Sequence, residues 1–149
     1  MSKVLKAFLA LAAAAPLAIG VGTGTAHANP PSVPQCRIDF DSLTATTLWN
    51  GSKDWVWVVM NGNYSPGNFA SVDFMSGTTQ VASAFGNPYE VVSSSGSVTF
   101  QVVLDRTWPK SNLVIDSNTV SCATTGYNLS LRFSNGTAVY DMRYDARIV

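Results

Sequence analysis

The stretch that decides the fold is Asp54-Trp55-Val56-Trp57-Val58-Val59-Met60, and the turn dipeptide Asn61-Gly62 follows it. Its six consecutive apolar residues, most of them β-branched or aromatic, favour a strand over a helix. Because side chains alternate along a strand, both faces of this one are apolar. Only one face of a strand meets the core of a two-layer β protein. The surplus face must therefore be covered by other parts of the chain or bind a ligand.

The two faces of this strand differ in their tryptophans. They consist of Trp55, Trp57 and Val59 on one side and Val56, Val58 and Met60 on the other. Two indoles two residues apart on a strand stand about 6.6 Å apart and can form a platform on which sugar rings stack. In immunoglobulin-like domains, by contrast, a tryptophan on a central strand lies in the core. We expect at least one of Trp55 and Trp57 to be a core residue.

The first 28 residues have the features of a secretion signal. A basic start at Lys3 and Lys6 precedes an almost unbroken run of small apolar residues at 7–21, and Ala26-His27-Ala28 has the form of a cleavage site. The run is short for a bilayer span of about 20 residues. We therefore predict a cleaved signal peptide at 1–28 and no transmembrane segment in the mature chain. The mature protein is expected to be extracellular, or associated with the cell envelope.

The composition of the mature chain excludes several classes of function. Two of the nine Lys and Arg lie in the signal, which leaves seven basic residues against nine acidic ones. A weakly acidic chain without a basic cluster is a poor nucleic-acid binder. The only histidine, His27, is also in the signal, so His-dependent catalytic triads and His-ligated metals are excluded. We predict no catalytic residue, no metal and no cofactor.

Two cysteines, Cys36 and Cys122, remain in the exported chain. An even pair in an oxidising compartment most simply forms one structural disulfide. A redox or nucleophilic thiol would need a Cys-x-x-Cys spacing or a basic neighbour that lowers its pKa, and the sequence offers neither.

Alternation of apolar and polar residues recurs after the proline-containing segment 29–34, which we expect to be flexible or extended. The alternation is clearest at 36–41, at 97–104 and in the Asn-Gly hairpin 127–148. No window has a convincing helical period, and turn signals recur about every 8–12 residues. We predict an all-β fold, an antiparallel, immunoglobulin-like β-sandwich of about seven to nine strands, as a single domain at residues 35–149.

Weaker patterns lead to more detailed expectations. We predict a strand at 78–85 and two short strands, Leu113–Ile115 and Thr119–Cys122, around a turn at Asp116-Ser117-Asn118. Such a turn could lend oxygens to Ca²⁺, but the pattern is too common to support a metal site. In the hairpin, Tyr127 is expected to face inward with Leu129, Leu131 and Phe133.

Aromatic residues near turns are the second group of candidate ligand contacts. Trp49 and Trp108 lie in predicted turns, and Tyr64 is close to another. Loops at one end of a sandwich can converge on a ligand, although such aromatics can also cap the open end of the core. Both interpretations stay open at this point.

The chain is therefore expected to bind rather than catalyse. The first hypothesis is a module for a polysaccharide or cell-envelope ligand, contacted by Trp49 and Trp108 and also by Trp55, Trp57 and Tyr64. The second is a protein–protein interaction domain, such as an inhibitor or effector, with an extracellular protein as its partner. The third and weakest is a two-carboxylate hydrolase that uses the neighbouring pair Asp39 and Asp41.

Overall fold

The computed structural model describes residues 33–61, 63–64, 71–85, 90–107 and 109–149. The expected signal peptide, most of the segment 29–34 and Trp108 lie outside the described residues. Pro31–Val149 form one compact unit. None of the helical structure in the described ranges is long and apolar enough to cross a membrane.

The described chain is built almost entirely of strands. They are β1 (Cys36–Thr47), β2 (Asp54–Met60), β3 (Asn63–Tyr64), β4 (Val72–Phe74), β5 (Thr79–Val81), β6 (Glu90–Ser93), β7 (Ser97–Leu104), β8 (Leu113–Ser121), β9 (Gly126–Ser134) and β10 (Val139–Ile148), and a short 3₁₀ helix, η1 (Ala82–Phe85), follows β5. Apart from the two-residue β3, these are nine strands, which is the upper end of the predicted range of about seven to nine.

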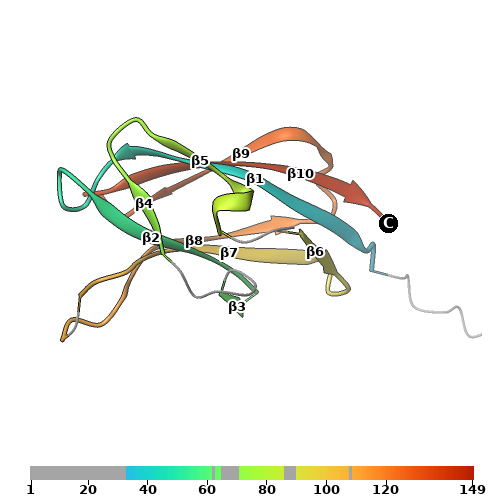
Figure 1. The fold of residues 1–149 in the computed structure, drawn as a ribbon. Helices are drawn as coiled ribbons and strands as arrows, with labels where there is room; N and C mark the ends of the chain where they lie inside the picture. The colour runs from blue at the N-terminus through green and yellow to red at the C-terminus, as the bar shows by residue number, and fades with distance from the viewer. Residues whose placement is uncertain (1–32, 62, 65–70, 86–89, 108) are drawn as a thin grey trace, which may run out of the picture. The chain divides into compact units, whose positions relative to one another are not determined.

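The strands form two antiparallel sheets that face each other (Figure 1). One sheet has the order β5-β1-β10-β9, with β6 also paired to β1. The other has the order β3-β2-β7-β8, with β4 also paired to β2. The predicted all-β antiparallel sandwich is therefore confirmed, while its immunoglobulin-like character stays a prediction.

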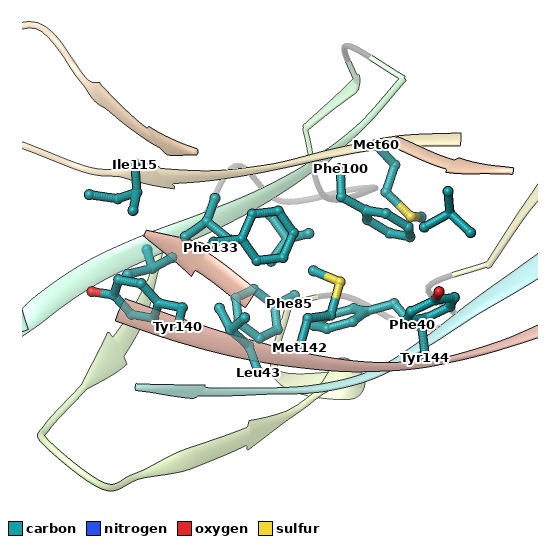
Figure 2. Close-up of a cluster of buried hydrophobic side chains, with 14 of the residues drawn as sticks. Phe40, Leu43, Met60, Phe85, Phe100, Ile115, Phe133, Tyr140, Met142 and Tyr144 are labelled. Atoms are coloured by element: carbon teal, nitrogen blue, oxygen red, sulfur yellow. The ribbon is translucent and has the colours of Figure 1, made fainter. Parts of the chain in front are cut away.

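Alternate side chains of both sheets fill the space between them (Figure 2). In β7 the inward residues are the predicted ones, and Val98, Phe100, Val102 and Leu104 are fully buried. Large rings from both sheets meet in this layer, and Phe74 packs edge-on against Tyr140 with ring centroids 5.8 Å apart. Burial of this apolar surface is the main force that holds the two sheets together.

The strand β2 turns its aliphatic face to the core. Val56 and Val58 are fully buried, whereas Trp55 is 39% exposed and Trp57 is half-buried on the opposite face. The expectation that at least one of these tryptophans is a core residue is therefore wrong. The large rings of other strands already fill the layer, so the shorter side chains of β2 fit opposite them. The surplus apolar face of the sequence is the tryptophan face.

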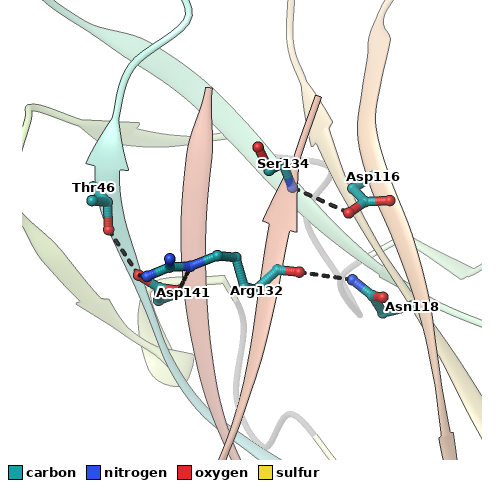
Figure 3. Close-up of polar contacts among 6 residues, drawn as sticks. All are labelled: Thr46, Asp116, Asn118, Arg132, Ser134 and Asp141. Carbon is teal, nitrogen blue, oxygen red and sulfur yellow. Dashed lines mark hydrogen bonds and ion pairs between the residues drawn. The ribbon is translucent and has the colours of Figure 1, made fainter. Parts of the chain in front are cut away.

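The expected turn at residues 116–118 is a continuous part of β8. The strand keeps its pairing with β7 through a register shift between Val102 and Val103. Figure 3 shows what the polar side chains do instead: Asp116 accepts from the Ser134 N–H at 3.1 Å, and Asn118 donates to the Arg132 carbonyl at 3.0 Å. These bonds join β8 of one sheet to β9 of the other. No group of residues able to hold a metal ion is present in the described ranges.

Arg132 continues this polar row across the outside of the neighbouring sheet. Its guanidinium pairs with Asp141 on β10 through two hydrogen bonds of 2.8 and 3.0 Å, and Asp141 also accepts from Thr46 on β1 (Figure 3). The hydrogen bond from Arg132 holds the pKa of Asp141 below its usual value. Three strands are therefore tied together on the solvent side, where apolar packing contributes little.

Two further expectations need correction. The predicted strand 78–85 ends at Val81, because the chain turns into η1 and inserts Phe85 into the core against Phe40, with ring centroids 5.4 Å apart. Tyr127 is 72% exposed instead of facing inward. It lies at the start of β9, where Asn128 adopts a positive φ of 54° that interrupts the regular alternation.

The disulfide between Cys36 and Cys122 is formed as predicted, and both residues are fully buried. It connects the first residue of β1 with the residue that directly follows β8, so it ties one sheet to the other. Asp39, by contrast, is engaged in an ion pair with Arg147 on the adjacent strand. One member of the possible carboxylate pair is thus used as a surface contact.

Candidate ligand-binding site

The β1–β2 and β7–β8 loops lie at the same end of the sandwich (Figure 1). Two adjoining cavities are lined by residues of these loops and of the neighbouring strand β2. The larger has a volume of about 360 Å³, and its wall includes Trp49, Asn50, Trp55, Asp105, Arg106 and Lys110. The smaller, of about 260 Å³, lies against Trp55, Ser71, Asp105 and Thr107. Trp55, Asp105 and Thr107 border both cavities, so the two lie side by side.

The cavity brings together two of the five aromatic residues that the sequence singles out. Trp49 comes from the β1–β2 loop and Trp55 from the beginning of β2. Trp57 lies on the same face of β2 as Trp55, but it lines neither of these cavities. Tyr64 is in β3 opposite Val59, towards the other end of β2. Trp108 lies outside the described residues.

The wall formed by Trp49 is held from inside the protein by Asp54. This carboxyl group is fully buried, and it accepts from the backbone N–H groups of Trp49 at 2.7 Å and of Asn50 at 3.1 Å. It also accepts from the Asn50 side chain at 3.0 Å and from the Tyr140 hydroxyl at 2.5 Å. The tight turn between Asn50 and Asp54 passes through Gly51, whose φ of +75° suits glycine. Asp54 thus fixes the backbone that carries Trp49.

The Trp55 indole is held by a cation. The Lys53 ammonium lies 5.1 Å from the ring centroid, within reach of a cation–π interaction, and it is also paired with Asp73 of β4 at 2.8 Å. A cation over the ring restricts its rotation and leaves the remaining exposed surface of Trp55 for a ligand. No pattern in the sequence indicates this role of Lys53.

The opposite wall is the start of the β7–β8 loop. The Asp105 N–H donates to the Trp55 carbonyl at 2.7 Å, and the Asp105 carboxylate accepts from the Ser71 hydroxyl at 2.8 Å. Arg106 donates from Nε to the Ser111 carbonyl at 2.6 Å, and its backbone N–H donates to the Asn112 side chain at 3.3 Å. These bonds place Asp105 and the Arg106 guanidinium firmly beside the indoles.

Four residues of the site were not predicted from the sequence, and these are Asp54, Asp105, Arg106 and Lys110. One signal was present for Asp54, since an acidic residue at the junction of a polar turn and an entirely apolar strand is suited to capping that turn. Apart from Trp108, no local pattern in residues 105–110 indicates a site. Placing them beside Trp55 requires the pairing of β2 with β7, in which Val56 lies opposite Leu104.

No family model matches the sequence, and the search of curated proteins finds no match either. Among solved structures, the paired C2 domains A and B of Extended-Synaptotagmin 2 align with 96% of this chain and 48% of that one, at 9% identity and a TM-score of 0.47. The C2 domain A of a plant Extended Synaptotagmin 1 aligns with 80% of this chain and 98% of that one, at 9% identity and a TM-score of 0.40. The chain thus spans about half the length of the first of these structures.

The contact between Tyr140 and Asp54 leads to a prediction for alkaline pH. Burial, and then the hydrogen bond to Asp54, raise the pKa of Tyr140 above the ordinary value of 10.0. Below pH 10 both the folded and the unfolded chain hold the phenol proton, so the contact contributes fully. Above pH 10 the unfolded chain loses that proton first, so unfolding becomes more favourable. We expect the stability advantage of the wild type over Tyr140→Phe to shrink above pH 10.

Urea unfolding of both proteins between pH 8 and pH 11 measures this advantage. The other tyrosines are common to the two proteins, so their titration cancels in the difference. An advantage that stays constant across the whole range would contradict the proposed contribution of the Tyr140 hydroxyl.

Proposed function

We propose that the protein is a secreted, non-catalytic binding module that holds a polysaccharide in the cavity between Trp49 and Trp55. The observation that carries this proposal is the convergence of two indoles with polar side chains on one hollow at the end of the sandwich. Aromatic faces suit the C–H-rich faces of sugar rings, and a few polar groups then fix orientation.

The polar part of the cavity suits hydroxyl groups. Asp105 is already oriented by Ser71, so its carboxylate can accept from a sugar hydroxyl without first being ordered. Asn50 and Thr107 also line the wall and offer further hydrogen-bonding groups. The volume of about 360 Å³ falls within the range of about 300–1,000 Å³ that is usual for ligand pockets.

Two features support binding in preference to hydrolysis. The sequence after the predicted signal has no histidine, which argues against His-dependent hydrolysis. Glycoside hydrolysis ordinarily uses two carboxyl groups that flank the scissile bond. Asp105 is the one acidic residue among the described residues that line the two cavities. The disulfide, together with the predicted signal peptide, supports export to an oxidising compartment.

We expect Trp55→Ala to weaken polysaccharide binding at least about tenfold, since a central aromatic contact of this kind typically contributes more than about 1.4 kcal/mol. Trp57→Ala is the matched control, because it removes an indole from the same face of the same strand but not from the cavity wall. The measurement is a pull-down on insoluble polysaccharides and isolated cell envelope, followed by calorimetric titration with a soluble fragment of the retained polymer. Circular dichroism first establishes that both variants are folded.

Equal binding by the two variants, or no binding to any polysaccharide, would contradict the proposal. Retention on cell envelope that is lost when the envelope is treated with a protease, but not with glycosidases, would also contradict it. That last result would instead support a protein partner.

A further inference from the structure

Most basic residues of the described chain form ion pairs with acidic residues. Most of those that form no ion pair line the cavity. Of its seven lysines and arginines, four are in ion pairs with acidic residues, and these are Arg37, Lys53, Arg132 and Arg147. The other three, Arg106, Lys110 and Arg143, form no ion pair within the described ranges. Two of these three, Arg106 and Lys110, line the larger cavity.

This concentration is notable in a chain whose acidic residues outnumber its basic ones after the predicted signal. Four of the nine acids are in ion pairs with other cations, and these are Glu90 with Arg37, Asp73 with Lys53, Asp141 with Arg132 and Asp39 with Arg147. Asp105, the acid of the cavity, accepts from a hydroxyl and not from a cation. The wall of the cavity therefore presents two positive charges that form no ion pair within the described ranges, beside the single carboxylate of Asp105.

The Arg106 side chain is also oriented. Its Nε–H is held by the Ser111 carbonyl at 2.6 Å, which restricts the guanidinium without neutralising it. A guanidinium that is fixed in this way can bind a carboxylate or a sulfate with little further loss of side-chain entropy. Lys110 lies four residues further along the same loop, and its N–H donates to the Thr107 carbonyl at 3.2 Å within a turn.

We propose that the ligand of this site is an acidic glycan, whose carboxylate or sulfate group is bound by Arg106 and Lys110 while its sugar ring lies against Trp49 and Trp55. This inference rests on the proposed function, and it specifies the chemical class of the polysaccharide. A neutral sugar that covered the cavity would remove water from two cations without giving them a partner, which is unfavourable. An anionic substituent supplies that partner.

The same cavity argues against a dense polyanion. Asp105 lies in the wall next to Arg106, and it would repel a ligand that carries a charge on every unit of a closely spaced backbone. Nucleic acids owe most of their affinity to many phosphate contacts with basic residues, and two cations in an acidic chain provide few of these. A sugar ring with one negative group and several hydroxyls fits both the cations and the carboxylate acceptor.

The test compares polymers that differ only in charge. Sparsely de-esterified polygalacturonate is paired with its fully methyl-esterified form, and lightly sulfated dextran with dextran, so that isolated carboxylates and isolated sulfates are examined separately. If the protein binds a polysaccharide of the cell envelope, its affinity for that polysaccharide is measured before and after the carboxyl groups of the polymer are amidated. We expect at least tenfold tighter binding to a charged form than to its neutral counterpart at low salt. This preference should fall as the ionic strength rises towards about 0.5 M.

The variants Arg106→Gln and Lys110→Gln should each weaken binding of the charged form about fivefold to tenfold, and neither should weaken binding of the neutral form, because each removes a cation that a neutral sugar would desolvate. Arg143→Gln is the matched control, because it removes the third cation without an ion pair, on β10 and away from the cavity wall. Its affinity should equal that of the wild type.

The failure of this inference is distinguishable from failure of the proposed function. Equal binding to charged and neutral forms, with the Arg106 and Lys110 variants unaffected, overturns the acidic ligand but leaves a sugar-binding cavity in place. Binding of no polysaccharide in either form overturns both. An equal loss in all three variants, Arg143→Gln included, would show general electrostatic attraction, and it also overturns the assignment to this cavity.

Discussion

The Asp54→Ala variant is expected to lose about 3–5 kcal/mol of the free energy of unfolding. The substitution removes the acceptor of four hydrogen bonds, which come from two backbone N–H groups, the Asn50 amide and the Tyr140 hydroxyl. Each buried donor left without a partner costs about 1–3 kcal/mol, and only the donors near the cavity can recover water. Because Asp54 is fully buried, alanine also leaves a small void.

Urea denaturation measures this loss as a shift of the unfolding midpoint at unchanged slope. Tyr140→Phe removes only one of the four donors and should cost about 1.5–2 kcal/mol. The matched control is Asp73→Ala, which removes an exposed carboxylate from the neighbouring strand β4. Its ion pair with Lys53 is at the surface, so its loss should cost less than about 1 kcal/mol.

A loss for Asp54→Ala no greater than that for Asp73→Ala would contradict the structural role of the buried carboxyl group. Folded Asp54→Ala protein should also bind its ligand more weakly, because the backbone of Trp49 and Asn50 is no longer fixed. Asp54 therefore affects both stability and binding, because it fixes the turn that places Trp49 in the cavity wall.

The all-β architecture could be predicted from the sequence because the alternation of apolar and polar residues in a strand indicates which side chains are buried. In β7 the four alternate apolar residues identify the inward face, since the intervening Thr99 and Gln101 are polar. In β2 the alternation does not identify the inward face, because the residues on both faces of the strand are apolar. The orientation of Trp55 and Trp57 depends instead on which side chains the facing strands supply, and that is a property of the tertiary packing.

The turn predicted at residues 116–118 shows a second limit of sequence reasoning. Asp, Ser and Asn favour turns because their side chains can bond to nearby backbone. In β8 the Asp116 and Asn118 side chains bond to the backbone of β9, a different strand. Asp116 does bond to the neighbouring backbone, through the Ser117 N–H at 2.7 Å, but the bonds to β9 join residues 14 and 18 positions apart in the sequence.

The candidate site could be predicted only in part for the same reason. Trp49 and Trp55 are among the candidate ligand contacts that the sequence indicates, and both line the cavity, although Trp49 also packs against the core as a capping residue would. The other lining residues include Asp105, Arg106 and Lys110, which follow β7. No local sequence pattern predicts that β7 pairs with β2. The charge of the cavity becomes apparent only when every ion pair elsewhere in the chain has been assigned.

Replacing both Cys36 and Cys122 by alanine is expected to lower the free energy of unfolding by about 4–5 kcal/mol. The disulfide closes a loop across a sequence separation of 86 residues, which contains nearly all of β1 and all of β2 to β8. In the chain-entropy model a cross-link of this span restricts the unfolded chain by about that amount. For a domain of this size we expect a fall in Tm of about 15 °C.

Thermal unfolding with and without reductant separates the cross-link from the substitution itself. Reduction should bring the wild type close to the double variant and leave the double variant unchanged, since no other cysteine is present. A double variant within about 1 kcal/mol of the oxidised wild type would contradict the prediction. That result would mean that the row of bonds from β8 to β9, together with the shared apolar core, already holds the two sheets in register without the covalent link.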